Sequence, residues 1–119
     1  MNDKLTIAIN WAGACGGCDV AILDIEDKIF NITQIADIVY WPVAMDFKRK
    51  DLFARQPDSI DITLFNGMIR NSEHLEDAKL LREKSRVMVA FGSCAHLGES
   101  REWRISPTGK VFSMWRICP

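Results

Sequence analysis

The chain has 119 residues, with 15 Lys and Arg against 16 Asp and Glu. This length predicts one domain with a single core. The balanced charge excludes the basic field that nucleic-acid binding or polybasic attachment to a membrane surface needs. Because the first apolar run soon meets glycine, it is too short for a secretory signal or a spanning helix, and we expect a cytoplasmic protein without membrane insertion.

The first half of the chain alternates between strand-like and helix-like patterns. Residues 4–11, "KLTIAINW", form a short apolar run rich in branched side chains, which predicts a buried strand. Residues 19–30, "DVAILDIEDKIF", place their apolar side chains on one broad helical face. Residues 36–43, "ADIVYWPV", predict a second strand that Pro42 ends.

The second half repeats this alternation. Residues 58–67 predict a third strand ended by Asn66-Gly67, residues 71–85 a helix with Ser72 as candidate N-cap, and residues 86–94 a fourth strand running into glycine. Acidic residues early in the helix and basic residues near its end suit its dipole. The whole order predicts an α/β fold with a mostly parallel, doubly wound sheet, in the common strand order 2-1-3-4.

Three of the four cysteines follow predicted strands. Cys15 and Cys18 come after the first strand and Cys94 after the last. Open parallel sheets build their binding crevices at the carboxyl ends of their strands, so we expect these three thiols to converge on one site. Gly16, Gly17 and other glycines nearby would let backbone N–H groups approach cluster sulfides closely.

The Cys15-Gly-Gly-Cys18 spacing alone leaves several chemistries open. A thiol-disulfide protein could use this pair at a helix N-terminus, and a zinc-binding or structural interaction module could use the thiolates in a closed site of four ligands. The purely structural alternative is that these cysteines are small residues buried in tight turns. The third thiol after another strand favours an iron-sulfur cluster.

The segments "CGGCDVAILDI", "LFNGMIRNSEH" and "VMVAFGSCAHLG" resemble, in order and spacing, the small subunit of nickel-iron hydrogenases, most closely the cytoplasmic methyl-viologen-reducing type. The same domain resembles the 20-kDa subunit of NADH:ubiquinone oxidoreductase. The resemblance covers residues 4–98. It implies a flavodoxin-like domain that holds the proximal 4Fe-4S cluster, with no catalysis by this chain alone.

The resemblance also implies residue roles and partners. Cys15, Cys18 and Cys94 correspond to three of the four cluster ligands, and Asp19 stands where relatives often have Glu beside the cluster; a plain helix N-cap is its alternative role. Electrons would come from a large subunit with the nickel-iron centre and pass to a further electron-accepting subunit. His96 is expected to be a loop histidine near the cluster.

The C-terminal residues depart from the resemblance. We divide the chain into a partial iron-sulfur domain, residues 1–98, and an atypical tail, residues 99–119. One allowed set of codons for residues 98–105, read one frame over, gives Gly-Ile-Pro-Gly-Met-Ala-Asn, which is similar to the family's continuation Gly-Ile-Pro-Gly-Leu-Ala-Asn. We therefore expect an out-of-frame tail on a truncated subunit. The fourth ligand is then either Cys118 or a residue lost by truncation.

Two further polar features receive structural interpretations. We expect His74, on the first turn of its helix, to be solvated, and residues 46–58, "DFKRKDLFARQPD", to be a solvated connection. The sequence offers no convincing Ser-His-Asp set, phosphate loop or carboxylate pair, so we assign no catalytic residue.

Overall fold

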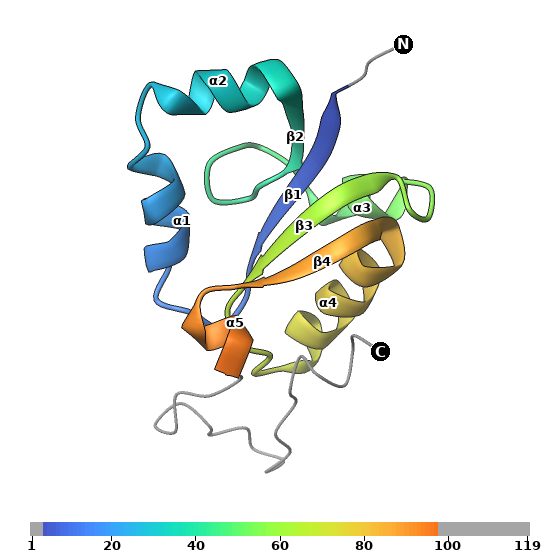
Figure 1. Ribbon diagram of the computed structural model, residues 1–119. Coiled ribbons are helices and arrows are strands. Elements are labelled where there is room, and N and C mark those ends of the chain that lie inside the picture. Colours follow the sequence, from blue (N-terminus) through green and yellow to red (C-terminus); the bar gives the residue numbers. More distant parts are fainter. Residues whose placement is uncertain (1–3, 98–119) are drawn as a thin grey trace.

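The computed structural model describes residues 4–97, and its core is a four-stranded parallel sheet (Figure 1). Its strands are β1 (Leu5–Trp11), β2 (Ala36–Tyr40), β3 (Ile60–Asn66) and β4 (Ser85–Phe91). They lie in the order β2-β1-β3-β4, and all three pairings are parallel. The predicted α/β, flavodoxin-like class with strand order 2-1-3-4 is therefore confirmed.

Five helices accompany the strands within the described residues. They are α1 (Gly17–Leu23), α2 (Lys28–Ile35), α3 (Arg49–Phe53), α4 (Ser72–Lys84) and α5 (Ser93–Leu97). The helices α1 and α2 lie on one face of the sheet, and α3 and α4 on the other (Figure 1). None of the helices in this part of the chain is long and apolar enough to cross a membrane. The tail, including Cys118, lies outside the described residues.

The single helix predicted for residues 19–30 is wrong, because two helices occupy this region. Glu26 adopts a left-handed backbone conformation with φ of 52°, which ends one helix before the next begins. The periodicity did not reveal the break, because both helices direct isoleucines toward the same space on the sheet. The predicted connection over residues 46–58 also contains a helix, α3, whose Leu52 is buried.

The start of α4 differs from the prediction by one residue. The N-cap is Asn71, whose side-chain oxygen accepts the backbone N–H of His74 at 2.8 Å, and Ser72 is the first helical residue. The imidazole of His74 is half-buried, and its Nδ1 accepts the backbone N–H of Arg70 at 3.2 Å. Burial lowers the pKa of His74. The expectation of a solvated histidine is therefore wrong, since this ring helps to close the turn before α4.

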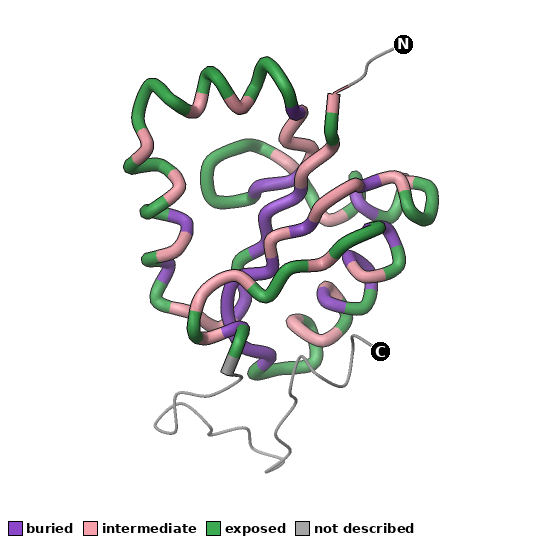
Figure 2. The backbone as a smooth tube through the Cα atoms, viewed as in Figure 1, coloured by how far each residue is buried: buried purple, intermediate pink, exposed green. Residues whose placement is uncertain are grey.

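The α3/α4 face of the sheet carries the tightly packed core (Figure 2). Phe65 of β3 and Ala78 and Leu81 of α4 are completely buried, and Leu52 of α3 joins the same cluster. Burial of apolar side chains is the main stabilising contribution to a fold of this size, and each buried Phe or Leu contributes roughly 1.5–3 kcal/mol. This face therefore anchors the strands whose carboxyl ends carry the cysteines.

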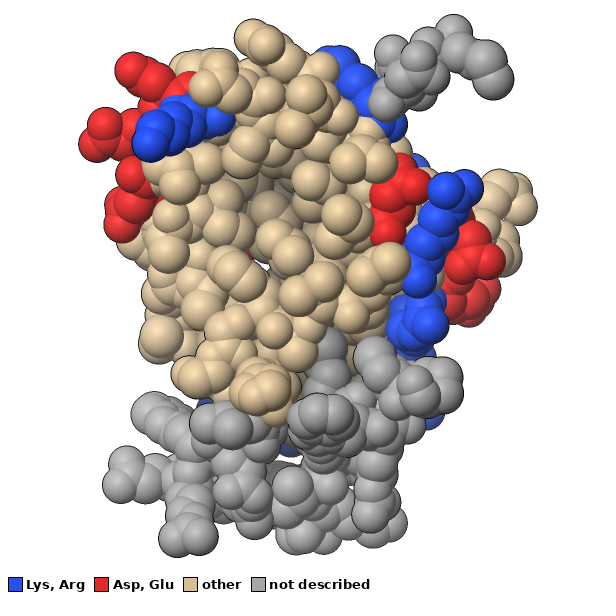
Figure 3. Space-filling model, viewed as in Figure 1, with Lys and Arg blue, Asp and Glu red and all other residues tan. Residues whose placement is uncertain are grey.

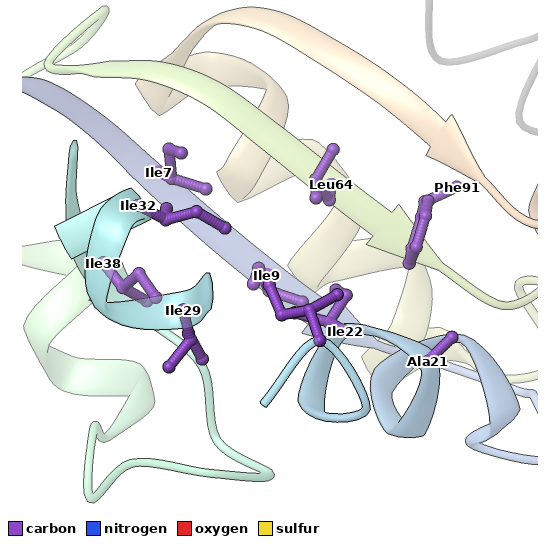
Figure 4. Close-up of a pocket in the computed structure, with 10 residues that line it drawn as sticks. Ile7, Ile9, Ala21, Ile22, Ile29, Ile32, Ile38, Leu64 and Phe91 are labelled. Carbon is purple, nitrogen blue, oxygen red and sulfur yellow. The ribbon is translucent and has the colours of Figure 1, made fainter. Parts of the chain in front are cut away.

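The α1/α2 face encloses an apolar cavity of about 270 Å³ instead (Figure 4). Its lining comes from the strands and both helices: Ile7, Ile9, Ala21, Ile22, Ile25, Ile29, Ile32, Ile38, Leu64 and Phe91. Figure 3 shows the opening as a hollow within a mostly uncharged surface. Val89, which pairs with Leu64, remains exposed beside it. This face is thus incompletely covered by the described residues.

Candidate iron-sulfur site

The three predicted thiols lie at the carboxyl edge of the sheet. Cys15 is in the loop after β1, Cys18 is in the first turn of α1, and Cys94 is in the first turn of α5, directly beyond β4. Figure 1 shows the β1–α1 loop and α5 at the same end of the sheet. The strand order places β3 between the strands that precede them. The topology therefore brings these segments together, as the sequence predicts.

Electrostatic interactions also connect the thiols. Burial is the largest cause of the raised pKa of Cys18, and the negative charges of Cys15, Cys94 and Asp19 raise it further. Cys18 and Cys94 are half-buried, whereas Cys15 is exposed, and all three are free thiols. The purely structural alternative, that the cysteines are small residues buried in tight turns, does not describe an exposed Cys15. A group of iron ions would relieve the repulsion that raises the pKa of Cys18.

The thiol-disulfide alternative finds no activated thiol at Cys18. A reactive Cys-x-x-Cys pair needs a cysteine whose pKa is lowered, usually by a helix N-terminus or a neighbouring cation. Cys18 does lie at a helix N-terminus, yet its pKa is raised. Cys18 is therefore not the attacking thiol of such a pair, and disulfide exchange would need Cys15 in that role.

The zinc alternative lacks its geometry in the described part of the chain. A structural zinc ion takes four ligands arranged tetrahedrally around one point. No group of three or more His, Cys, Asp and Glu side chains among residues 4–97 is placed to hold a single metal ion. A 4Fe-4S cluster makes a different demand, because each of its thiolates binds a different iron. Three thiols at separate positions along one edge of the sheet suit a 4Fe-4S cluster better than a single zinc ion.

The loop that carries Cys15 is held to the neighbouring strand segment. The backbone N–H of Gly13 donates to the carbonyl of Met68 at 2.9 Å, and Met68 returns a hydrogen bond at 3.1 Å. The indole of Trp11 donates to the carbonyl of Ala14 at 3.1 Å. The backbone N–H of Gly17 points at the sulfur of Cys15 at 3.4 Å. These bonds preorganise the loop and already direct one N–H donor at a candidate ligand.

Glycine at position 92 leaves room for the sulfur of Cys18. Its φ of 85° is a left-handed conformation that other residues adopt only at a cost. A Cβ atom built on Gly92 would overlap the Sγ atom of Cys18. The turn before Cys94 and the thiol of Cys18 are therefore in direct contact, so the segments that follow β1 and β4 meet at this edge of the sheet.

Asp19 does not cap α1, so its N-cap interpretation is wrong. Gly16 occupies the N-cap position, and α1 has no side-chain cap. The carboxylate of Asp19 is 1% exposed and accepts hydrogen bonds from Trp41 Nε1 at 2.9 Å and Asn66 Nδ2 at 2.7 Å. The alternative placement, beside the thiols, agrees with its effect on the pKa of Cys18.

The two partners of Asp19 are not among the residues singled out from the sequence. In the sequence analysis Trp41 is part of a predicted strand, and Asn66 only marks the end of another. Asn66 could have been recognised, because a polar side chain at the carboxyl end of a central parallel strand often faces a binding site. The short helix α5, which contains Cys94 and His96, is also not predicted. His96 is exposed on that helix, and its backbone N–H donates to the carbonyl of Gly92 at 3.0 Å.

Comparisons with curated proteins find hydrogenase subunits. The chain is 43% identical over 95 residues to an F420-non-reducing hydrogenase iron-sulfur subunit of Archaeoglobus profundus, covering 79% of this chain and 30% of the relative. It is 35% identical over 98 residues to an F420-non-reducing hydrogenase subunit of Methanothermobacter thermautotrophicus, covering 82% and 30%. The chain thus spans about 30% of the length of these relatives.

Structure and family comparisons agree with this result. A solved chain described as "Crystal structure of NAD+-reducing [NiFe]-hydrogenase in the H2-reduced state" superposes with a TM-score of 0.66 at 27% identity, covering 77% of this chain and 47% of that one. The model of the family described as "NADH ubiquinone oxidoreductase, 20 Kd subunit" matches residues 15–113, which include all three clustered cysteines and extend beyond residue 98. The resemblance expected from the sequence is confirmed, and the chain belongs to this family.

Proposed function

We propose that this chain forms part of a hydrogenase electron-transfer subunit and supplies Cys15, Cys18 and Cys94 as three of the four ligands of the proximal 4Fe-4S cluster. The observation that carries the proposal is the contact between the Cys18 sulfur and Gly92, in the turn before Cys94, because it joins two cysteine-bearing segments that are far apart in the sequence. The name of the Archaeoglobus profundus relative, an iron-sulfur subunit, supports it.

The residues around the site would act by binding and by electrostatics. When bound, a 4Fe-4S cluster accepts and releases one electron at a time. The three thiols would bind iron as thiolates, and the N–H of Gly17 would donate to the sulfur of Cys15, which raises the reduction potential. The carboxylate of Asp19 beside Cys18 would oppose an additional negative charge and lower it.

Anaerobic reconstitution with iron and sulfide tests this proposal. Because the proposed site supplies three thiolates to a cluster that takes four, we expect substoichiometric iron or a labile three-iron or solvent-ligated species, seen by absorption and EPR spectroscopy. Cys94→Ser should remove it, whereas Cys118→Ser should change little. Absence of any iron-sulfide chromophore in the wild type would refute cluster binding, and loss of a stable four-iron spectrum in a folded Cys118→Ser variant would identify Cys118 as the fourth ligand.

We further propose that the chain acts in the cytoplasm against a large subunit with the nickel-iron centre, and that a further subunit accepts the electrons. Support comes from the hydrogenase names of the relatives and from the nickel-iron hydrogenase that matches in structure. Co-purification of the tagged chain with a co-expressed nickel-iron subunit tests the first contact. A chain that never co-purifies, although its circular dichroism spectrum shows it to be folded, would contradict this partner.

The division into residues 1–98 and 99–119 also stays a proposal. The family match ends at residue 113, so family similarity alone does not stop at residue 98. Sequencing the encoding locus decides whether another reading frame continues into a hydrogenase-like segment with a Gly-Cys-Pro-Pro motif. If no frame contains such a continuation, the out-of-frame interpretation is wrong.

A further inference from the structure

The helix that carries Cys18 is attached to the sheet mainly through a polar side chain. All residues of α1 are described, and Asp19 is the only one of them that is buried. Val20 and Leu23 of the same helix are 53% and 44% exposed, and Ile22 only borders the open cavity. Apolar burial therefore contributes little to fixing the position of this helix, and another interaction has to do so.

The carboxylate of Asp19 supplies that interaction. Its two oxygens accept hydrogen bonds from two different segments, Trp41 after β2 and Asn66 at the end of β3. All three side chains are 1% exposed, so water cannot replace a lost partner. Hydrogen bonds to a charged acceptor are stronger than neutral ones, and removing the acceptor would leave two buried donors unsatisfied.

Asn66 also borders the turn that leads to Cys94. Its Oδ1 lies 4.0 Å from the position of a Cβ atom on Gly92, and the Cys18 sulfur lies closer still to the same position. The chain of contacts thus runs from Asp19 through Asn66 to Gly92. The segments that carry Cys18 and Cys94 therefore both lie next to the buried side-chain amide of Asn66.

We infer that Asp19 is a positioning residue whose buried hydrogen bonds to Trp41 and Asn66 hold Cys18 against the turn before Cys94. The relevance of this clamp to a cluster rests on the proposed function, but the clamp itself is a property of the chain without iron. Its action is local: it fixes α1 on a face of the sheet where apolar packing is sparse.

Alkylation of individual cysteines in the iron-free chain tests the clamp. In a Cys15→Ser background, iodoacetamide labelling of Cys18 and Cys94 can be followed separately by peptide mass spectrometry. Asp19→Leu, which keeps the number and branching of the side-chain heavy atoms without an acceptor, should make Cys18 react about tenfold faster than Asp19→Asn does, the factor expected from losing a buried hydrogen bond. Asp19→Asn removes the same negative charge, and with it the contribution of Asp19 to the raised pKa of Cys18, but its amide still accepts one bond and Asn66 can reorient to accept another. The comparison of the two variants therefore isolates the hydrogen bonds.

Three controls separate positioning from general damage. Asp24→Leu, at the exposed C-cap of the same helix, should leave the rate unchanged. If Asp19→Leu does not fold, Trp41→Phe removes only one donor and should give a smaller acceleration in the same direction. Circular dichroism and urea unfolding establish that each compared variant is folded.

The outcomes distinguish this inference from the proposed function. Equal reactivity of Cys18 in Asp19→Leu and Asp19→Asn, or parallel acceleration of Cys94 together with global destabilisation, would overturn the clamp. In reconstituted protein, Asp19→Leu should also lose iron to a chelator faster than Asp19→Asn. If the wild type binds no iron while the alkylation result holds, the proposed function fails and the clamp remains.

Discussion

The two faces of the sheet are stabilised in different ways. On the α3/α4 face, Phe65 and Leu81 are completely buried in a continuous apolar cluster. On the α1/α2 face, apolar side chains surround a cavity, and α2 has no buried residue (Figures 3 and 4). The thiol-bearing loop and helix belong to the second face, so the candidate site depends on hydrogen bonds more than on packing.

This difference shows how a crevice can be shaped on a small sheet. The packed face fixes the strands, including the central β3 from which Asn66 extends. The other face positions α1 through a few polar contacts, which are directional and set the location of one side chain more narrowly than apolar contact does. Two pairs of substitutions test whether the faces differ as much as the structure indicates, and two further comparisons test single contacts at the two ends of the strands.

The largest expected difference in stability is between the truncations of two leucines, one on each face of the sheet. Leu81→Ala removes a completely buried side chain and should lower the free energy of unfolding by about 3–5 kcal/mol. Leu64→Ala removes a half-buried side chain that already borders the cavity, and should cost only about 1–2 kcal/mol. Urea unfolding followed by circular dichroism measures both. Equal losses would show that the α1/α2 face is packed as tightly as the other.

Enlarging two alanines, one on each face, provides the reverse test. The same substitution to leucine should have opposite effects on stability. Ala78→Leu inserts atoms into a filled core and should destabilise by about 1–3 kcal/mol. Ala21→Leu extends from α1 toward the cavity and should stabilise by up to about 1 kcal/mol. Thermal unfolding of the two variants beside wild type gives the signs directly. A destabilising Ala21→Leu would mean that the cavity cannot admit the added atoms.

Gly92 tests the crevice itself. Gly92→Ala places a Cβ against the Cys18 sulfur at a left-handed backbone position, and should cost about 1–2 kcal/mol and prevent iron binding. Gly17→Ala is the matched control, because its φ is ordinary and its new Cβ would lie 3.3 Å from the Cys15 sulfur. We expect Gly17→Ala to fold with nearly wild-type stability and retain iron. Iron retention by Gly92→Ala would show that the Cys18 sulfur does not need this space.

The sequence predicted the strands and their order, because apolar runs bounded by glycine or proline are local signals and parallel connections have few arrangements. It also predicted where the three cysteines would lie, since strand ends fix the carboxyl edge of the sheet. The break at Glu26 and the five-residue helix α3 escaped detection, because one backbone angle and one short turn leave no periodicity. The Asp19 clamp escaped because Trp41 and Asn66 meet only through tertiary structure.

The smallest predicted effect concerns a second carboxylate, at the opposite end of the sheet from Asp19. The Oδ2 atom of Asp61 accepts the backbone N–H and the hydroxyl of Thr6, both at 2.9 Å, and these bonds lower the pKa of Asp61. A carboxylate with a lowered pKa in the folded state contributes stability above its unfolded pKa of about 3.9 and loses that contribution as the pH falls through the folded value.

Thr6→Val removes the hydroxyl donor and so weakens this pH dependence, while Thr6→Ser keeps it. The stability difference between wild type and Thr6→Val should therefore be largest above about pH 4 and narrow as the pH falls from there through the lower folded pKa of Asp61, below which the carboxyl is protonated in the folded and the unfolded state. Thr6→Ser should follow the wild-type pH dependence. Urea unfolding from pH 3 to 7 measures these differences. The titration of the other carboxylates is common to the three proteins, so its effect on stability largely cancels in the differences. A constant difference across this range would mean that the Thr6 hydroxyl contributes through Ser59 and the backbone of Asp61, its other partners, and not through the carboxylate.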